Sequence, residues 1–266
     1  MKLVFGLLVL AGAACAQLRD NQTPQMLCDG GNYDRNRQRF CEVREQTIPG
    51  VGRLTVDPGQ NGGVTVRGWL RNDISIRSRV ETWAPSVGEA SALAGLVRVD
   101  ASAGQIKASG PDPQRDSSWS VSYEIFVPQM TDLSTTSFNG GINVSDVRGR
   151  IEFDAKNGGV RLTRVAGDVR GQTLNGGIQV ELTGRTWEGG QLDARTTNGG
   201  ITLSMPDNYS AHIQTGTVNG AVDSDFPIGV PVQDRTRPRN LDFNVGSGGP
   251  LIHVSTTNGG VKLRKI

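Results

Sequence analysis

A short unit, Asn-Gly-Gly, recurs through the second half of the chain and constrains its fold more than any other feature. Three copies begin 18 residues apart, at Asn139, Asn157 and Asn175. Related copies with other spacings begin at Asn61, Asn198, Asn219 and Asn258. A fixed period of this kind is typical of chains in which one supersecondary unit is repeated and each copy packs on its neighbours.

The unit belongs to a wider alternation of apolar and polar residues. Aliphatic side chains stand three positions after each Asn, at Val64, Ile142, Val160, Ile178, Ile201, Val222 and Val261. Most copies have a second aliphatic two positions later, with Ser224 as the exception, and a small residue, usually Thr, two positions before the Asn. Alternation with period two between glycine corners predicts short β-strands.

Two all-β architectures fit this pattern. In an antiparallel meander the Asn-Gly pairs are hairpin turns, and turns on one edge recur about 10 Å apart. In a flattened β-solenoid, equivalent residues of successive coils stack at about 4.8 Å and touch. Because the same side chains recur at every corner, we predict the β-solenoid, with positive φ at the corner glycines. The Asn amides would then bond in a column of Asn139, Asn157, Asn175, Asn198, Asn219 and Asn258.

The chain divides into four predicted parts, namely a signal peptide over residues 1–16, an irregular segment with a disulfide over residues 17–50, a β-rich part with one helix over residues 51–132, and the repeat region over residues 133–266. The helix is expected over residues 86–97, because Ser86 and Glu89 stand in capping-box positions and apolar residues recur on one face. We expect it to cover one end or side of the sheets.

The first residues have the composition of a secretory signal peptide. Lys2 precedes an apolar run that is too short to span a bilayer, and Ala14-Cys15-Ala16 then supplies an Ala-x-Ala site. We predict cleavage after Ala16 and a secreted or periplasmic, envelope-associated protein. Cys15 leaves open the alternative of a lipoprotein anchored at that residue. No later segment is apolar enough for a membrane helix.

The other two cysteines, Cys28 and Cys41, predict one disulfide, since an even pair at short separation in an exported chain usually pairs. Two free thiols are the alternative. The chain has only two histidines, His212 and His253, and neither has a partner at zinc-ligand spacing. We therefore expect no metal site and no cofactor.

Charge argues against some classes of partner. The chain has 28 basic and 26 acidic residues, interspersed along its length. Such a distribution lacks the concentrated positive charge of a nucleic-acid-binding protein. Repetitive faces carrying Arg, Asp, Thr and Asn suit many weak contacts, so the expected partners are a cell-surface glycan or an envelope protein.

With these motifs assembled, the chain resembles the bacterial DUF4097 family, which carries the label "putative adhesin". The resemblance covers roughly Thr47 to Arg264 and rests on repeated Thr-x-Asn-Gly-Gly-Ile/Val, on Gly216 to Gly220, and on Thr256 to Val261. It implies an exported protein built from β-strand repeats. It transfers no catalytic residues to this chain.

Candidate chemistry is sparse. Four acidic residues on neighbouring repeats could form a carboxylate pair of the kind that glycosidases use: Asp146, Glu152, Asp154 and Asp168. The alternative is that they are solvated positions balanced by nearby arginines. Trp187, in an insertion between two repeats, is the best candidate for stacking on a sugar.

Our main hypothesis is a non-enzymatic structural or adhesin-like binding module at the cell envelope. One alternative is a carbohydrate-active enzyme, a polysaccharide lyase or glycosidase, on the same scaffold, in which Asp154→Asn would abolish turnover. Another is a periplasmic component of envelope-stress signalling. Each hypothesis requires a different site. The binding module needs an extended binding face, the enzyme a cleft with two carboxylates, and the signalling component a protein-docking surface.

Overall fold

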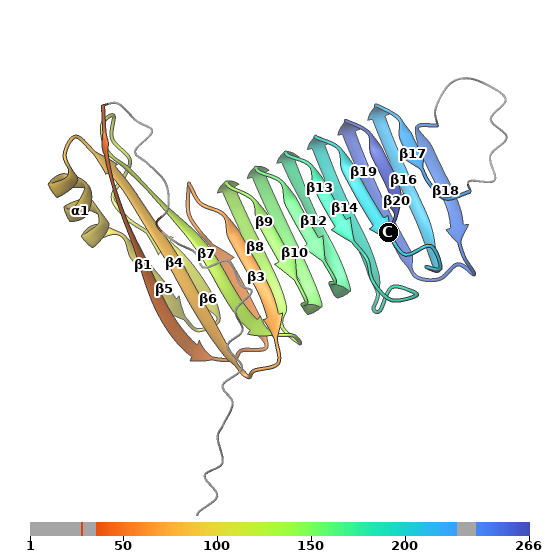
Figure 1. Ribbon diagram of the computed structural model, residues 1–266, viewed down its shortest axis with the longest axis horizontal. Coiled ribbons are helices and arrows are strands. Elements are labelled where there is room, and N and C mark those ends of the chain that lie inside the picture. The colour runs from red at the N-terminus through yellow and green to blue at the C-terminus, as the bar shows by residue number, and fades with distance from the viewer. Residues whose placement is uncertain (1–27, 29–35, 228–237) are drawn as a thin grey trace, which may run out of the picture.

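The computed structural model describes Cys28, residues 36–227 and residues 238–266. The predicted signal peptide lies outside these described residues. Within them the fold is nearly all β, with twenty strands and one helix, and the strands form two ten-stranded, mostly parallel sheets. Figure 1 shows the strands following one another along the long axis, with α1 (Val87–Leu96) near one end and β18 (Asn240–Val245) near the other.

The sheets are named A and B. In spatial order, sheet A contains β1 (Gln38–Pro49), β4 (Asp73–Ala84), β7 (Ser118–Pro128), β3 (Val64–Trp69), β9 (Ile142–Ser145), β11 (Val160–Thr163), β13 (Ile178–Glu181), β15 (Ile201–Met205), β20 (Val261–Lys265) and β17 (Val222–Ser224). Sheet B contains β18, β16 (Ala211–Asn219), β19 (Leu251–Asn258), β14 (Gln191–Asn198), β12 (Ala166–Asn175), β10 (Arg148–Asn157), β8 (Asp132–Asn139), β2 (Arg53–Asp57), β6 (Gln105–Ser109) and β5 (Arg98–Ser102).

From β8 to β15 the chain alternates between the sheets, and we call one strand of sheet B with the following strand of sheet A a rung. Neighbouring rungs pair in parallel and in register, so that Asn139 lies beside Asn157 and Ile142 beside Val160. A meander would place consecutive antiparallel strands side by side. Parallel pairing therefore excludes the meander for these strands.

The recurring aliphatic side chains point between the two sheets. Ile142, Val144, Leu162 and Ile178 have no exposed surface, and they belong to one hydrophobic cluster that continues into the N-terminal strands. Each buried aliphatic contributes roughly 1.5–3 kcal/mol relative to exposure. The alternate residues of the same strands face solvent, which places the polar side chains on the two outer faces.

The first glycine of each unit is needed because the rungs approach closely. A Cβ on Gly158 would lie 2.0 Å from the carbonyl oxygen of Gly140, and one on Gly176 would lie 2.1 Å from that of Gly158. The prediction of positive φ at all these corners is wrong, since among the first glycines only Gly62 and Gly259 have φ in the left-handed range. Steric exclusion by the neighbouring carbonyl is the physical reason for glycine at the others.

The threonine two positions before the Asn in four of the copies also bonds a neighbouring rung. Thr173 Oγ1 donates to the carbonyl oxygen of Gly158 at 2.8 Å, and Thr196 Oγ1 donates to that of Gly176 at 2.7 Å. Thr217 and Thr256 make the equivalent bonds. These threonines are buried, and a buried hydroxyl without a hydrogen-bond partner is costly.

The last rung does not follow sequence order. Strand β19 lies between β14 and β16, and β20 lies between β15 and β17. In consequence Asn258 pairs with Asn198 on one side and with Asn219 on the other. The rung of β19 and β20 is therefore last in sequence, but in space it lies between the rung of β14 and β15 and the strands β16 and β17.

The N-terminal part differs from the prediction of an irregular segment over residues 17–50. Residues Gln38–Pro49 form β1, which pairs antiparallel with the whole of β4. The sequence pattern does not predict this strand, because the side chains of β1 are exposed or half-buried and few of them are apolar. Its long partner β4 supplies the hydrogen bonds that hold it.

Helix α1 begins as predicted, with Ser86 as N-cap and Glu89 completing a capping box. Ala90, Ala94 and Val97 are buried against the sheet, whereas Val87 is 54% exposed and departs from the expected apolar face. Arg44 of β1 donates to the carbonyl oxygens of Ala94 and Val97 at the end of the helix. A cation at the C-terminal end of a helix bonds its last carbonyl oxygens and interacts favourably with the helix dipole.

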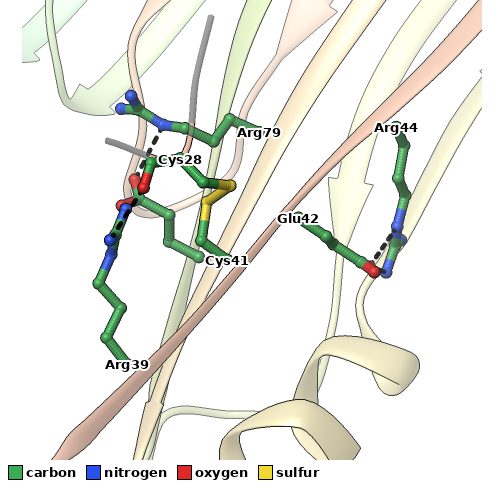
Figure 2. Close-up of a disulfide and its surroundings, with 7 residues drawn as sticks. Cys28, Arg39, Cys41, Glu42, Arg44 and Arg79 are labelled. Atoms are coloured by element: carbon green, nitrogen blue, oxygen red, sulfur yellow. Dashed lines mark hydrogen bonds and ion pairs between the residues drawn. A yellow bond between two sulfur atoms is a disulfide. The ribbon is translucent and has the colours of Figure 1, made fainter. Parts of the chain in front are cut away.

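A disulfide joins Cys28 to Cys41, as predicted, with Cα atoms 5.7 Å apart (Figure 2). Beside it Arg39 contacts both the Cys28 carbonyl oxygen and Glu81, and Arg79 also reaches Glu81. The bond therefore joins Cys28 to strand β1 of sheet A. Across the described residues, no helix has the length and apolar character needed to cross a membrane.

Candidate functional site

The outer face of sheet B is hollowed along its length. Three hollows of about 490, 520 and 980 Å³ follow one another across its strands. The first two share Thr136 and Asp154, and the last two share Gln172 and Arg195. We call the three together the sheet B groove. It runs across the strands, along the direction in which the rungs stack.

The first hollow has an aromatic end. Phe138, at the end of β8, is 47% exposed and lines this hollow together with the edge of Trp119, whose indole nitrogen donates to the carbonyl oxygen of Pro111. Asp57, Asp154 and Lys156 are the charged residues around it. A flat apolar ring beside carboxylate and ammonium groups is a combination that can stack on a sugar and hydrogen-bond its hydroxyls.

The largest hollow lies over β19 and β16, where the outward side chains at one register position are small. Arg195 of β14 lies beside Ser255 of β19, which in turn lies beside Gly216 of β16. At this register position a long side chain is therefore followed by a short one and then by none. Arg195 bounds the hollow on one side, and Asn240 of β18 bounds it on the other. A step from large to small residues across neighbouring strands therefore creates the depression.

A charged cluster joins the middle hollow to the largest. Asp193 accepts hydrogen bonds from Arg195 Nε at 2.9 Å and Nη2 at 2.8 Å, and His253 Nδ1 lies 2.9 Å from its Oδ1. Burial by itself raises the pKa of Asp193, but the bonds to Arg195 and His253 outweigh it and hold the pKa below its usual value. Asp193 is thus ionised at neutral pH and orients both basic groups.

A second pair lies towards the edge of the sheet. His212 Nε2 is 2.6 Å from Asp242 Oδ1, and Gln214 donates to the other carboxylate oxygen at 3.1 Å. The hydrogen bond to His212 is the main cause of the lowered pKa of Asp242. Both histidines therefore lie on sheet B beside a carboxylate, at positions that the sequence leaves unassigned.

The asparagines of the predicted column lie side by side along one corner. Each side-chain amide nitrogen donates to the amide oxygen of the neighbouring Asn at 2.8–2.9 Å, in the order Asn219, Asn258, Asn198, Asn175, Asn157, Asn139 and Asn61. The order follows the stacking of the rungs and not the sequence. These residues border the sheet B groove but line none of its hollows.

Trp187, the residue singled out for sugar stacking, is 3% exposed, and its indole nitrogen donates to the carbonyl oxygen of Gly167 at 3.0 Å. Its ring fills the core below the insertion, so it offers no platform to a ligand. Phe138 has the exposed ring instead. The sequence signal for Phe138 is an aromatic ring at the outward position one residue before a corner Asn, where other copies carry Lys156, Leu174, Thr197, Val218 and Thr257.

The four candidate carboxylates do not gather into one cluster. Asp146 lies at a corner and is held by two hydrogen bonds from Arg164, and Asp168 contacts Arg170. Only Glu152 and Asp154 line the groove, where Glu152 contacts Arg53 and Asp154 contacts Lys156. Among the described residues no group of three or more His, Cys, Asp and Glu side chains is arranged to hold a metal ion.

Comparison with known proteins gives only distant structural similarity. No family model matches the chain, and no curated protein matches its sequence. The chain is similar to a "putative cell adhesion protein" from Clostridium sporogenes, with 9% identity, a TM-score of 0.44, and coverage of 86% of this chain and 100% of the other.

Two further solved structures are similar at a lower level. A "putative adhesin" from Bacteroides fragilis has 10% identity and a TM-score of 0.33, with coverage of 85% of this chain and 97% of the other. A "putative lipid binding protein" from Parabacteroides distasonis has 9% identity and a TM-score of 0.32, with the same coverage.

Proposed function

We propose that this chain is a β-solenoid that acts outside the cytoplasm as a non-enzymatic binding module, and that the sheet B groove binds an extended glycan of the cell envelope or cell surface. The disulfide Cys28–Cys41 supports the location, because such bonds persist in oxidising compartments. The signal-like composition of residues 1–16 also supports this location.

The continuity of the groove is the observation that carries the proposal. A single hollow suits one small molecule, but three hollows that share lining residues suit a polymer lying along the stack. Phe138 supplies an apolar ring at one end. Arg195, Gln172 and Asn240 supply donors and acceptors further along, where sugar hydroxyls need both.

The arrangement of the groove carboxylates favours binding over catalysis. Glu152 and Asp154 are ion-paired with Arg53 and Lys156, and their side chains are 47% and 43% exposed, so neither lies in an enclosed, water-free site. The largest hollow of the groove is lined mostly by hydroxyl and amide groups. Many weak contacts along an open face are suited to retention of a polymer.

A glycan array with the protein from Gln17 onward tests the proposal. Phe138→Ala is expected to weaken binding to the retained glycans about tenfold, since stacking on the ring is lost. Leu174→Ala is the matched control, because Leu174 occupies the equivalent outward position two rungs away, is 43% exposed and lines no hollow of the groove. Equal binding by both variants and wild type would refute the assignment of the groove.

A turnover screen on the retained glycans separates binding from catalysis. We expect no release of reducing ends or unsaturated products by the wild-type protein. Product release that Asp154→Asn abolishes would overturn the non-enzymatic assignment in favour of a carbohydrate-active enzyme.

A further inference from the structure

A smaller hollow of about 300 Å³ lies on the opposite outer face, on sheet A. Three arginines line it: Arg67 of β3, Arg161 of β11 and Arg164, which follows β11. The other polar lining residues are Thr65, Asn143, Ser145 and Thr163. This hollow has no lining residue in common with the sheet B groove.

The register explains why the hollow forms. Strand β9 lies between β3 and β11, with Ser145 beside Arg67 on one side and Asn143 beside Arg161 on the other. The floor is therefore made of a serine and an asparagine, and the arginines stand at diagonally opposite corners. Since adjacent strands are about 4.8 Å apart, the two arginines are separated by two strand spacings, which leaves room for a small group between them.

The charges around the hollow are incompletely balanced. Arg161 is exposed and has no hydrogen-bond or ion-pair partner among residues 36–227 and 238–266 or Cys28. The Nε–H of Arg67 is buried and has no acceptor in the same residues, and its guanidinium is 3.8 Å from Glu124. Glu124 is shared with Arg77 at 3.4 Å, so it does not neutralise both.

Arg164 is held differently from the other two. It donates to both carboxylate oxygens of Asp146 at 2.7 Å, and both residues have positive φ, 51° for Arg164 and 58° for Asp146. Left-handed backbone is uncommon in residues other than glycine, so it persists only where surrounding contacts hold it. Arg164 is therefore already paired with Asp146, whereas Arg67 has only a distant ion pair, so Arg67 and Arg161 carry the charged donors available to a ligand.

We propose that this hollow binds a phosphate group, with the guanidinium groups of Arg67 and Arg161 as the charged donors and with the Asn143 amide and the Ser145 and Thr163 hydroxyls as neutral ones. Guanidinium groups pair with phosphate through short, charge-assisted hydrogen bonds. Donors on several sides of one hollow suit a tetrahedral anion better than a planar carboxylate. The site goes beyond the proposed glycan groove and does not depend on it.

Titration with inorganic phosphate at constant ionic strength tests the site. The observed signals are the arginine Nε–H resonances in a nitrogen-15 NMR spectrum, with acetate as the comparison anion. We expect saturable shifts for Arg67 and Arg161, and at least a tenfold weaker dissociation constant in Arg161→Gln. Arg150→Gln is the control, because Arg150 is exposed on sheet B and lines none of the hollows described.

Shifts that rise linearly without saturation, an equal response to acetate, or an equal loss in Arg150→Gln would each overturn the site. The source of the phosphate is then determined with phosphatidylglycerol vesicles, phosphatidylcholine vesicles and a soluble glycerol-phosphate polymer. Binding to phosphatidylglycerol vesicles that is lost in Arg161→Gln identifies a lipid headgroup. Binding to the polymer alone identifies a soluble phosphate-bearing chain. Because Phe138→Ala lies on the other face, it is expected to leave phosphate binding unchanged.

Discussion

The side-chain amide of Asn258 donates to the amide oxygen of Asn198, 60 positions earlier in the chain, at 2.8 Å. Asn219, which is nearer in sequence, lies on the far side of Asn258. The final rung is therefore inserted between two others, and its strands contact β14 and β15 on one face and β16 and β17 on the other. Several consequences of this stacking can be measured.

Cysteine cross-linking checks the order of the rungs. Cysteines at Asn198 and Asn258 are expected to form a disulfide, because neighbouring parallel strands lie within the Cα separation of 4.4–6.8 Å that a disulfide spans. Cysteines at Asn198 and Asn219 are two strands apart, about 10 Å, and are expected to remain reduced. Peptide mapping by mass spectrometry distinguishes the two, and a link between positions 198 and 219 would show that the rungs stack in sequence order.

Gly158→Ala is expected to destabilise the protein by about 3 kcal/mol or more, the upper range for overpacking. The reason is the 2.0 Å distance between the added Cβ and the carbonyl oxygen of Gly140. Gly159→Ala is the matched control, since its added Cβ would lie 3.4 Å from the nearest atom, and Ala221 already occupies the equivalent position in another rung. Urea denaturation measures both, and similar losses would contradict the close approach.

Ala155→Thr is expected to stabilise the protein by about 1 kcal/mol, the usual net contribution of a hydrogen bond. Ala155 is buried and lies beside Thr173 in register, and it lacks the hydroxyl that Thr173 donates to the next rung. Ala155→Val has the same shape without the hydroxyl. Denaturation midpoints that are equal for the two variants would show that the hydroxyl contributes nothing.

Asp193 is expected to make stability depend on pH in the acid range. Its pKa is below the usual value of about 3.9 because Arg195 and His253 stabilise the carboxylate against the opposing effect of burial. A depressed pKa in the folded state contributes stability that is present above the unfolded pKa and is lost as the pH falls through the folded one. The difference in unfolding free energy between wild type and Asp193→Asn should therefore shrink from pH 5 to pH 2.5.

Asp100→Asn is the control for this measurement, because Asp100 is exposed on β5 and lies outside the charged cluster on the sheet B face. Its substitution is expected to change the unfolding free energy little at either pH. A difference for Asp193→Asn that stays constant over this range would mean that Arg195 and His253 do not favour its ionised form in the folded protein.

The strands of the repeat were predictable from sequence because their signals are local. Ile142 and Val144 alternate with polar residues within one strand, and burial of the first set follows directly from that alternation. The capping box at Ser86 is equally local. Strand β1 lacked such a signal, since its hydrogen bonds depend on β4, which comes later in the chain.

The order of the last rung and the position of the groove could not be predicted in the same way. The corner residues Thr256 to Gly260 repeat those of Thr196 to Gly200, so local preference does not determine which rung pairs with which. The groove depends on that order, because Ser255 lies beside Arg195 only when β19 is inserted. Trp187 was misjudged for a related reason, since the space that buries its ring is formed by the rung around Gly167.

The close approach of Gly140 and Gly158 has a consequence for both outer faces. No side chain fits between the glycines of successive corners, so the distance between neighbouring rungs is fixed. Side chains on the two outer faces repeat at the same distance. A polymer whose own repeat length differs from it would fall out of alignment after a few units, whereas a commensurate one could extend its contacts along the whole molecule.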